Sequence, residues 1–195
     1  PKVFSGHNRI KISWLRGNDI SVTKVRIFWN NYADSVEVLI PAQGDTISTI
    51  IENLPEKRYS FFLKTYDLTG HSSVPVEVLT VAYGEKYQSS LQNRIINTSI
   101  MDALGIVTTQ WGDADISNGA YTTEVIYTNT SGTPTKQRIA VNQSITLISD
   151  YKDGTTYQYS TIYLPDTTCI DTFYTAFTDQ HVSKKLVNSN WTATA

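Results

Sequence analysis

One pair of aromatic residues with a fixed spacing occurs twice in this chain. Trp14 and Tyr59 are 45 residues apart (59 − 14), and Trp111 and Tyr157 are 46 apart (157 − 111). The second pair follows the first by 97 and 98 residues (111 − 14 and 157 − 59). Self-similarity at a fixed period indicates one structural unit used twice. The 195 residues therefore predict two units, and at roughly 90 residues each unit is long enough to close its own core.

Alternation of apolar and polar residues predicts short strands in the first copy. Ile10, Ile12 and Trp14 alternate with Lys11 and Ser13, which is typical of a strand with one buried face. Similar short segments, separated by Gly, Asn, Asp and Pro, follow at 25–29, 36–38, 47–51, 59–63 and 74–78. Many short strands at this spacing indicate an antiparallel β-sandwich.

The turn before Tyr59 adds a second sandwich feature. Leu54 and Pro55 precede Tyr59, so the tyrosine hydroxyl is expected to bind backbone a few residues upstream, as at the corner of many sandwiches. The second copy predicts strands at 107–111 and 123–127, an equivalent corner ending at Tyr157, and a last strand containing Phe173 and Phe177. Its core is richer in tyrosine, and we expect the second unit to be the less stable one.

The region between the copies predicts a helix. Tyr87, Leu91 and Ile95 are spaced i, i+4 and i+8, which places them on one face of a helix of about ten residues. A spacer that covers the domain junction is favoured over a partner-binding helix. The predicted boundaries are 1–83 for the first sandwich, 84–101 for the helical linker, 102–180 for the second sandwich and 181–195 for a tail.

Composition narrows the function classes. The formal net charge is −2, with dispersed Lys and Arg, so nucleic acid is not an expected partner. No apolar run approaches the ~20 residues that cross a bilayer. Cys169 is the single cysteine and cannot form an intrachain disulfide; we expect it to be a buried thiol near the start of the last strand.

The tryptophans, the Leu-Pro-x-x-x-Tyr corner and the strand spacing resemble fibronectin type III domains. The predicted fold is therefore all-β, with two tandem fibronectin type III-like, immunoglobulin-like antiparallel sandwiches joined by a short helical linker. The first corner departs from the usual spacing, because Leu54 and Tyr59 are five residues apart where six is common, and Tyr151 replaces the expected leucine in the second.

Three segments also resemble an uncharacterised family of Bacteroidetes surface lipoproteins: 25–31 (VRIFWNN), 33–36 (ADSV) and 87–94 (YQSSLQNR). This resemblance implies export to the bacterial outer-membrane surface or periplasm, membrane contact only through an N-terminal lipid anchor, and a location facing glycans. It implies partners that are glycans or other surface protein modules. We also expect the chain to be a monomer. The segment 186–195 resembles the lead-in to a discoidin-like sugar-binding module.

Two sets of residues are candidates for binding. Asp113, Asp115, Ser117 and Glu124 occupy positions 1, 3, 5 and 12 of a loop, the oxygen-ligand spacing of a calcium loop, although ordinary loop residues explain the same pattern. Exposed aromatic rings stack on sugars, and the surface candidates are Trp29, Tyr32, Tyr66, Tyr121 and Trp191, whereas Trp14 and Trp111 are predicted core.

The sequence shows no enzyme signature. His7, His71 and His181 are far apart, and no nucleophile elbow or paired metal-ligand spacing occurs. We predict no catalytic residue and no cofactor. The favoured function is a noncatalytic β-sandwich segment of a bacterial cell-surface protein that spaces or presents a glycan-binding or adhesive module. Direct carbohydrate binding, and an ancillary role in a secreted glycosidase, are the alternatives.

Overall fold

The computed structural model describes residues 1–185 and confirms an all-β chain. The chain divides into two compact units. Unit 1 consists of Pro1–Ser90 and Asp166–Thr172, and unit 2 consists of Leu91–Pro165 and, among the described residues, 173–185. No helix within residues 1–185 is long and apolar enough to span a membrane.

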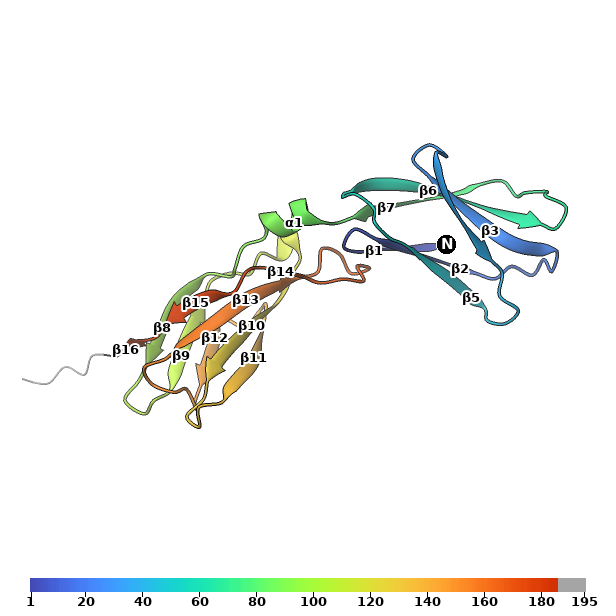
Figure 1. The fold of residues 1–195 in the computed structure, drawn as a ribbon. Helices are drawn as coiled ribbons and strands as arrows, with labels where there is room; N and C mark the ends of the chain where they lie inside the picture. Colours follow the sequence, from blue (N-terminus) through green and yellow to red (C-terminus); the bar gives the residue numbers. More distant parts are fainter. Residues whose placement is uncertain (186–195) are drawn as a thin grey trace, which may run out of the picture. The chain divides into compact units, whose positions relative to one another are not determined.

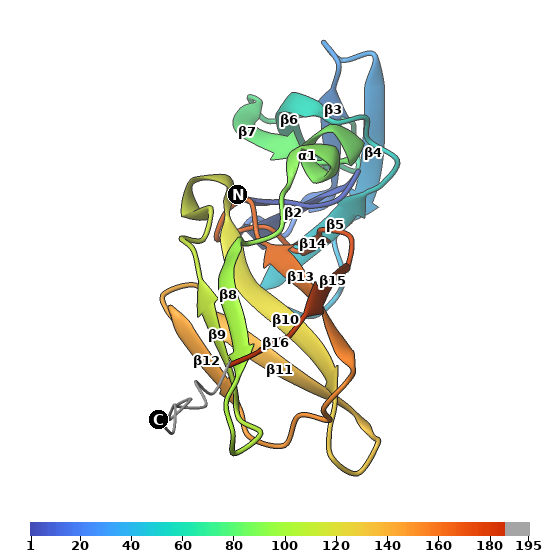
Figure 2. The same cartoon turned by 90° about the vertical axis from the view of Figure 1, so that its left-hand side faces the viewer.

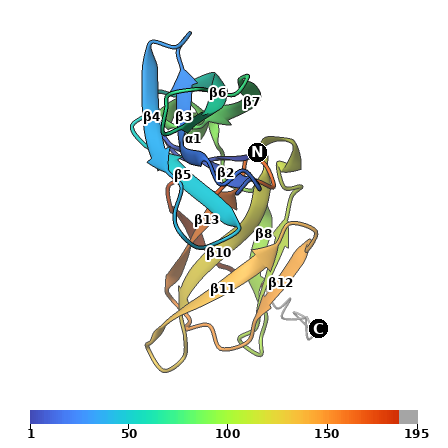
Figure 3. The same ribbon diagram turned by 90° about the vertical axis from the view of Figure 1, so that its right-hand side faces the viewer.

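Unit 1 is a sandwich of a three-stranded and a four-stranded antiparallel sheet (Figure 1). The first sheet has the order β1–β2–β5, formed by β1 (Lys2–Ser5), β2 (Ile10–Leu15) and β5 (Thr46–Ile51). The second has the order β4–β3–β6–β7, formed by β4 (Asp34–Leu39), β3 (Val22–Trp29), β6 (Lys57–Asp67) and β7 (Val76–Ala82). Figure 3 shows β4 beside β3. This three-plus-four arrangement is that of fibronectin type III-like sandwiches.

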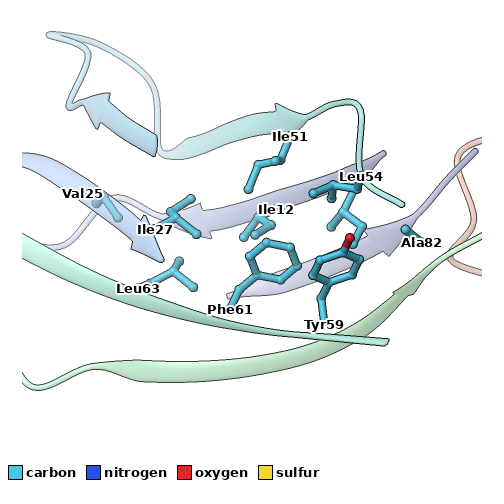
Figure 4. Packing of buried hydrophobic residues seen from close by; sticks show 10 residues of the cluster. Ile12, Val25, Ile27, Ile51, Leu54, Tyr59, Phe61, Leu63 and Ala82 are labelled. Atoms are coloured by element: carbon cyan, nitrogen blue, oxygen red, sulfur yellow. The ribbon is translucent and has the colours of Figure 1, made fainter. Parts of the chain in front are cut away.

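Aliphatic side chains fill the core of unit 1 (Figure 4). Alternate residues of each strand point inward, so Ile10 and Ile12 of β2 meet Phe61 and Leu63 of β6. The remaining buried members are Val25, Ile27, Ile51, Leu54, Tyr59 and Ala82. The Tyr59 hydroxyl donates to the Pro55 carbonyl at 2.9 Å, as predicted for the corner.

The helix after β7 is shorter than the sequence predicts. Helix α1 (Glu85–Ser90) has six residues, and Leu91 and Ile95 lie beyond it. Glu56 starts the helix, because its carboxylate accepts the backbone N–H groups of Lys86 and Tyr87 at 2.7 and 2.9 Å. The i, i+4, i+8 pattern fails because residues 91–95 form no helix. Asn93 and Arg94 bond instead to Thr161 of a strand in unit 2.

Unit 2 also has two sheets (Figure 2). One has the order β12–β9–β8–β16, with β12 (Ile145–Ile148), β9 (Val107–Trp111), β8 (Ile96–Met101) and the parallel β16 (Ser183–Lys184). The other has the order β11–β10–β13–β14, with β11 (Pro134–Ala140), β10 (Ala120–Thr128), β13 (Thr156–Tyr163) and β14 (Phe173–Tyr174), and β15 (Thr178–His181) also pairs with β13. A 3₁₀ turn, η1 (Ile116–Asn118), precedes β10.

The residues just after α1 are part of the framework of unit 2. The Asn93 side chain accepts the Thr161 N–H at 2.8 Å and donates to the Ala176 carbonyl at 2.8 Å. The Tyr163 hydroxyl donates to the Gln92 carbonyl at 2.6 Å. These bonds tie 92–93 to β13 and to the chain after β14. The last strand predicted from sequence, which contains Phe173 and Phe177, is divided into β14 and β15. Phe177 lies between them and is exposed.

Polar side chains enter the core of unit 2. The Tyr157 hydroxyl lies 3.0 Å from the Thr109 hydroxyl and 3.1 Å from the Ser99 hydroxyl, all buried. The predicted second corner is therefore wrong in detail, because Tyr157 bonds to core hydroxyls rather than to upstream backbone. Tyr151 makes the local bond instead, donating to the Thr155 carbonyl.

The loop between β13 and β14 belongs to unit 1. Its backbone N–H at Ile170 donates to the Ser5 carbonyl at 2.8 Å, and the Ser5 hydroxyl donates to Asp166 at 2.5 Å. Arg9 forms two bonds to Asp171, at 2.9 and 2.5 Å. Residues 166–172 thus complete the edge of unit 1 near β1, although they fall within the 102–180 range that the sequence assigns to the second sandwich.

Candidate functional site

Three aromatic rings gather on the outer face of the four-stranded sheet of unit 1. Phe28 of β3 and Phe62 of β6 are directly opposite each other in the strand register. Both point outward, because their neighbours Ile27 and Phe61 point into the core. Tyr32, from the turn between β3 and β4, lies 5.1 Å from Phe28 and 5.0 Å from Phe62, measured between ring centroids. We call Phe28, Tyr32 and Phe62 the Tyr32 cluster.

The Tyr32 ring is nearly parallel to that of Phe62. The interplanar angle is 19°, whereas Phe28 is tilted by 45° from Tyr32. Tyr32 keeps 48% of its surface exposed, and the two phenylalanines are half-buried beneath it. Offset stacking of this kind is a favourable aromatic geometry, so the exposed ring is held in a defined orientation.

An unusual backbone presents Tyr32 to the sheet. Asn30, Asn31 and Tyr32 have φ values of 49°, 53° and 65°, all in the left-handed region. Asparagine tolerates this region, but a bulky tyrosine rarely adopts it. The Asn30 side chain secures the turn, donating to Asp34 at 2.6 Å and accepting from Lys57 at 2.9 Å. The turn is therefore held in the conformation that places the Tyr32 ring over Phe62.

Two cations lie next to the cluster. The Arg26 guanidinium is 5.1 Å from the Phe28 ring centroid and donates to the Ser35 hydroxyl at 3.1 and 3.0 Å. The Lys64 ammonium lies 5.9 Å from the Tyr66 ring centroid. Arg26 and Lys64 are directly opposite each other in the β3–β6 register. The outer face thus combines an aromatic surface with positive charge.

The other predicted surface aromatics have different environments. Trp29 is half-buried and packs on the core, with its ring centroid 5.9 Å from that of Phe61. Tyr66 is half-buried on β6, and Tyr121 is 58% exposed on β10 in unit 2. Trp191 lies outside the described residues. Sequence reasoning missed Phe28 and Phe62, although the alternation that buries Val25 and Ile27 places Phe28 on the opposite face.

The predicted calcium ligands do not converge. Asp115 caps the start of η1, and its carboxylate accepts from the Ser117 hydroxyl at 2.7 Å and the Asn118 side chain at 2.6 Å. Those bonds lower the pKa of Asp115, the Asn118 side chain contributing most. Glu124 points from β10 toward Lys136, at 3.2 Å, on β11. Within residues 1–185 no group of three or more His, Cys, Asp or Glu side chains is placed to hold a metal ion.

A polar cavity of about 370 Å³ lies at the edge of unit 1. Its lining residues are His7, Asn8, Arg9, Glu52, Asn53 and Asp171. The bonds from Arg9 are the main cause that lowers the pKa of Asp171, and the same contact raises the pKa of Arg9. The geometry of Arg9 and Asp171 is that of a two-bond structural ion pair.

The single cysteine, Cys169, is half-buried, and its thiol is hydrogen-bonded to the backbone. The Cys169 thiol donates to the Asp171 carbonyl at 3.2 Å, and burial raises its pKa. A reactive cysteine has a lowered pKa, so this thiol has the properties of a structural residue. It lies in the loop before β14, close to where the sequence places it.

Comparison of the sequence with models of protein families identifies the family of this chain. The model of DUF4998, a domain of unknown function, matches residues 1–173. The chain belongs to the DUF4998 family. A comparison of this DUF4998 chain with curated proteins found no match.

Comparison with solved structures found fibronectin type III segments among the matches. A two-domain fibronectin type III segment of chicken tenascin is 14% identical over 92% of this chain and 94% of its own, with a TM-score of 0.35. The FN1-FN3 domains of chicken CNTN1 are 11% identical over 94% of this chain and 66% of their own, with a TM-score of 0.43. The sheet order of unit 1 in this DUF4998 chain is itself that of a fibronectin type III-like sandwich.

Trp14 differs from its predicted role in the DUF4998 fold. It packs against the core but is only half-buried, and it lines a cavity of about 440 Å³. The other lining residues are Pro1, Lys2, Phe4, Ser13, Leu15 and Thr46. Its indole nitrogen is buried without a hydrogen-bond partner in the described chain. Trp111 of unit 2 is core, as predicted, and its indole donates to the Thr146 hydroxyl at 2.9 Å.

Proposed function

We propose that this chain is a noncatalytic β-sandwich segment of a bacterial cell-surface protein that contacts carbohydrate directly through the Tyr32 cluster. The near-parallel stack of Tyr32 on Phe62 carries the proposal. An exposed ring presents a flat apolar face to the C–H face of a sugar, and its hydroxyl offers a polar edge. The left-handed turn and the contacts of Asn30 hold that ring in place before a ligand arrives, which reduces the entropy lost on binding.

The surroundings of the chemically reactive side chains support a noncatalytic role. Nδ1 of His71 lies 2.9 Å from the Asp67 carboxylate in the same loop. The Cys169 thiol donates to the Asp171 carbonyl. Arg9 and Asp171 pair with each other. Each of these groups has a structural partner. The Thr69 hydroxyl and the Asp67 carboxylate both contact Nδ1 of His71, at 2.8 and 2.9 Å, whereas in a catalytic triad the nucleophile and the orienting acid contact opposite nitrogens of the ring.

The second candidate is a spacer that presents a neighbouring glycan-binding or adhesive module. It is favoured by the closed hydrophobic core of each unit, which lets the segment act as a folded support. Under this candidate, a glycan-binding activity resides in another module of the protein.

Export to the bacterial outer-membrane surface or periplasm is part of the proposal and rests on the resemblance of 25–31, 33–36 and 87–94 to surface lipoproteins. Membrane contact occurs through an N-terminal lipid anchor, and the segment itself is a monomer. Fractionation of cells that express the full gene product tests the location, and light scattering of the chain tests the monomer.

A glycan array probed with the chain 1–195 distinguishes the two candidates. We expect the wild type to bind at least one glycan and Tyr32→Ala to lose that binding. Tyr121→Ala is the matched control, because Tyr121 is a comparably exposed tyrosine on unit 2. No binding by the wild type to any glycan favours the spacer, and equal loss in both variants contradicts a site at Tyr32.

A further inference from the structure

We propose that the carbohydrate bound at the Tyr32 cluster is acidic, and that Arg26 and Lys64 recognise the carboxylates of its uronate residues. This inference rests on the proposed direct contact with carbohydrate and specifies the class of sugar. It starts from the charges of the sheet face that carries the cluster.

Arg26 and Lys64 are an unfavourable pair in the free protein. They are directly opposite each other on β3 and β6, on the same outward face. Like charges at opposed positions of a sheet destabilise it. Within residues 1–185 neither cation forms a salt bridge, and their contacts are the Ser35 hydroxyl and the Phe28 and Tyr66 rings. An anion placed between them would remove the repulsion.

The acidic residues on the same face do not supply that anion. Glu37 is opposite Arg26 on β4, but its carboxylate lies 3.0 Å from the Lys24 ammonium. Glu77 is opposite Phe62 on β7 and makes no salt bridge with a described residue. The positive charge of Arg26 and Lys64 therefore remains available next to the rings.

The spacing of the sheet suits a uronate. Arg26 is two residues from Phe28 along β3, a distance of about 6.8 Å, and neighbouring strands are about 4.8 Å apart. A uronate carries its carboxylate at the edge of the sugar ring. A ring stacked on Tyr32 can therefore direct the carboxylate toward Arg26 and Lys64, whose long side chains span the remaining distance.

The two basic residues contribute differently. The planar guanidinium of Arg26 matches the two oxygens of a carboxylate, whereas Lys64 acts as a mobile point charge. The Phe28 ring and the Ser35 hydroxyl hold the Arg26 head in place, so little side-chain freedom is lost when it binds. Arg26 is the specificity determinant in this arrangement, and Lys64 strengthens the local field.

Calorimetric titration of the chain 1–195 with short oligogalacturonates tests the inference. The matched ligand is the methyl ester of the same oligosaccharides, which keeps the sugar rings and removes the charge. We expect the acid to bind about tenfold more tightly than the ester, or about 1.4 kcal/mol. Binding of the acid should weaken as salt screens the charges.

The double variant Arg26→Gln, Lys64→Gln should lose this preference while its affinity for the ester stays unchanged. Lys136→Gln, Arg138→Gln is the control, because it removes the same charge from a strand of unit 2. Thermal melting checks that both double variants remain folded.

The outcomes separate the inference from the proposed function. Equal binding of acid and ester, lost in Tyr32→Ala, overturns the acidic ligand and keeps the carbohydrate site. The same follows when only neutral glycans bind on the array and require Tyr32. If the chain binds no glycan, acidic or neutral, both proposals are wrong.

Discussion

The cores of the two units are built from different side chains. In unit 1 the buried residues are aliphatic apart from Phe61 and Tyr59, and the one tyrosine hydroxyl reaches out to a backbone carbonyl. In unit 2 four tyrosines and a tryptophan share the core with buried serine and threonine. The first core depends on removing apolar surface from water, and the second depends additionally on satisfying polar groups inside it.

This difference affects how each core responds to substitution. An aliphatic core accepts changes that keep its volume. A core with buried hydroxyls is sensitive to the loss of a single oxygen, because the partner is left unsatisfied. Hydrogen-bonded polar groups take up part of the core of unit 2. We therefore expect unit 2 to have a lower melting temperature than unit 1 in calorimetry of the chain.

The largest effect is expected from the centre of unit 1. Phe61→Ala removes a fully buried ring and leaves a cavity beside Trp29 and Tyr59. We expect the free energy of unfolding of unit 1 to fall by about 3–5 kcal/mol, measured by urea denaturation. Leu79→Ala, at an exposed position, should change it by less than about 0.5 kcal/mol. A small effect of Phe61→Ala would mean that the aliphatic core does not control the stability of unit 1.

A buried cation gives the corresponding test in unit 2. Arg94 is 5% exposed, donates to the carbonyls of Gly112 and Ala140 at 2.7 and 3.2 Å, and lies 5.7 Å from the Trp111 ring centroid. Burial lowers its pKa. Arg94→Met keeps the bulk but removes the donor to the Gly112 carbonyl, whereas the Ala140 carbonyl keeps the Gln143 N–H at 3.0 Å. We expect the free energy of unfolding to fall by about 2 kcal/mol.

Urea denaturation of two further variants, Arg94→Lys and Arg138→Met, tests whether the effect is specific to the buried guanidinium. Lysine keeps the charge and one donor, so Arg94→Lys should retain part of the stability. Arg138 is an exposed arginine on β11, and its replacement should have little effect. Equal losses in Arg94→Met and Arg138→Met would show that the buried polar network is not important.

The two equivalent tyrosines compare the units directly. Tyr157→Phe removes a hydroxyl that bonds to Thr109 and Ser99 in the core, and should cost about 1–2 kcal/mol. Tyr59→Phe removes one bond to Pro55 and should cost about 1 kcal/mol. Both losses are measured by urea denaturation at one pH. A larger cost at Tyr59 would reverse the comparison.

The repeat of Trp and Tyr predicted the all-β fold and several strands, but not these roles. Period-two alternation places residues on faces and correctly located β2, β3, β9 and β10. It does not say which partner a tyrosine hydroxyl finds, since Tyr59 and Tyr157 lie 45 and 46 residues after their tryptophans (59 − 14 and 157 − 111) and have different partners. Those partners come from other strands, at sequence separations of 48 and 58 for Tyr157.

Sequence reasoning found one residue of the candidate site and missed its companions. Tyr32 is a candidate from sequence because it borders a turn. Alternation places Phe28 on the face opposite Val25 and Ile27, but it does not indicate that Phe28 and Phe62 lie next to Tyr32. The cluster forms through the register of β3 with β6 and a left-handed turn, which are long-range and conformational properties. The helix after β7 was predicted too long for a similar reason, because bonds from Asn93 to β13 override the local periodicity.

The ion pairs of the two units should respond differently to acid. Bonds from Arg9 lower the folded-state pKa of Asp171, and Lys184 does the same for Asp153. A lowered folded pKa gives stability that is present above the unfolded value of about 3.9 and is lost as pH falls through the folded value. The Asp171 side chain is 18% exposed and that of Asp153 is 55% exposed, so solvent screens the second pair more strongly.

Melting temperature against pH, from about pH 6 to pH 2, measures this difference. We expect Asp171→Asn to flatten the acid side of the unit 1 transition, and Asp153→Asn to change the unit 2 transition much less. Asp67, whose pKa is lowered to about 2 chiefly by the His71 side chain, remains in both variants and retains its own acid dependence. Identical profiles for Asp171→Asn and the wild type would contradict a stabilising role for the Arg9 pair.

The smallest expected effect concerns the loop from Asp113 to Gly119 of unit 2. A calcium site with a millimolar dissociation constant would stabilise unit 2 by about 1.4 kcal/mol at ten times that concentration, which is a shift of roughly 6 °C or more for a domain of this size. We expect no shift on adding Ca²⁺, because Asp115 already bonds to Ser117 and Asn118, and Glu124 faces Lys136. Mg²⁺ and a chelator serve as controls for ionic strength. A calcium-specific shift that Asp115→Asn abolishes would show that the loop rearranges around the ion, and it would place a second ligand site in unit 2, away from the Tyr32 cluster.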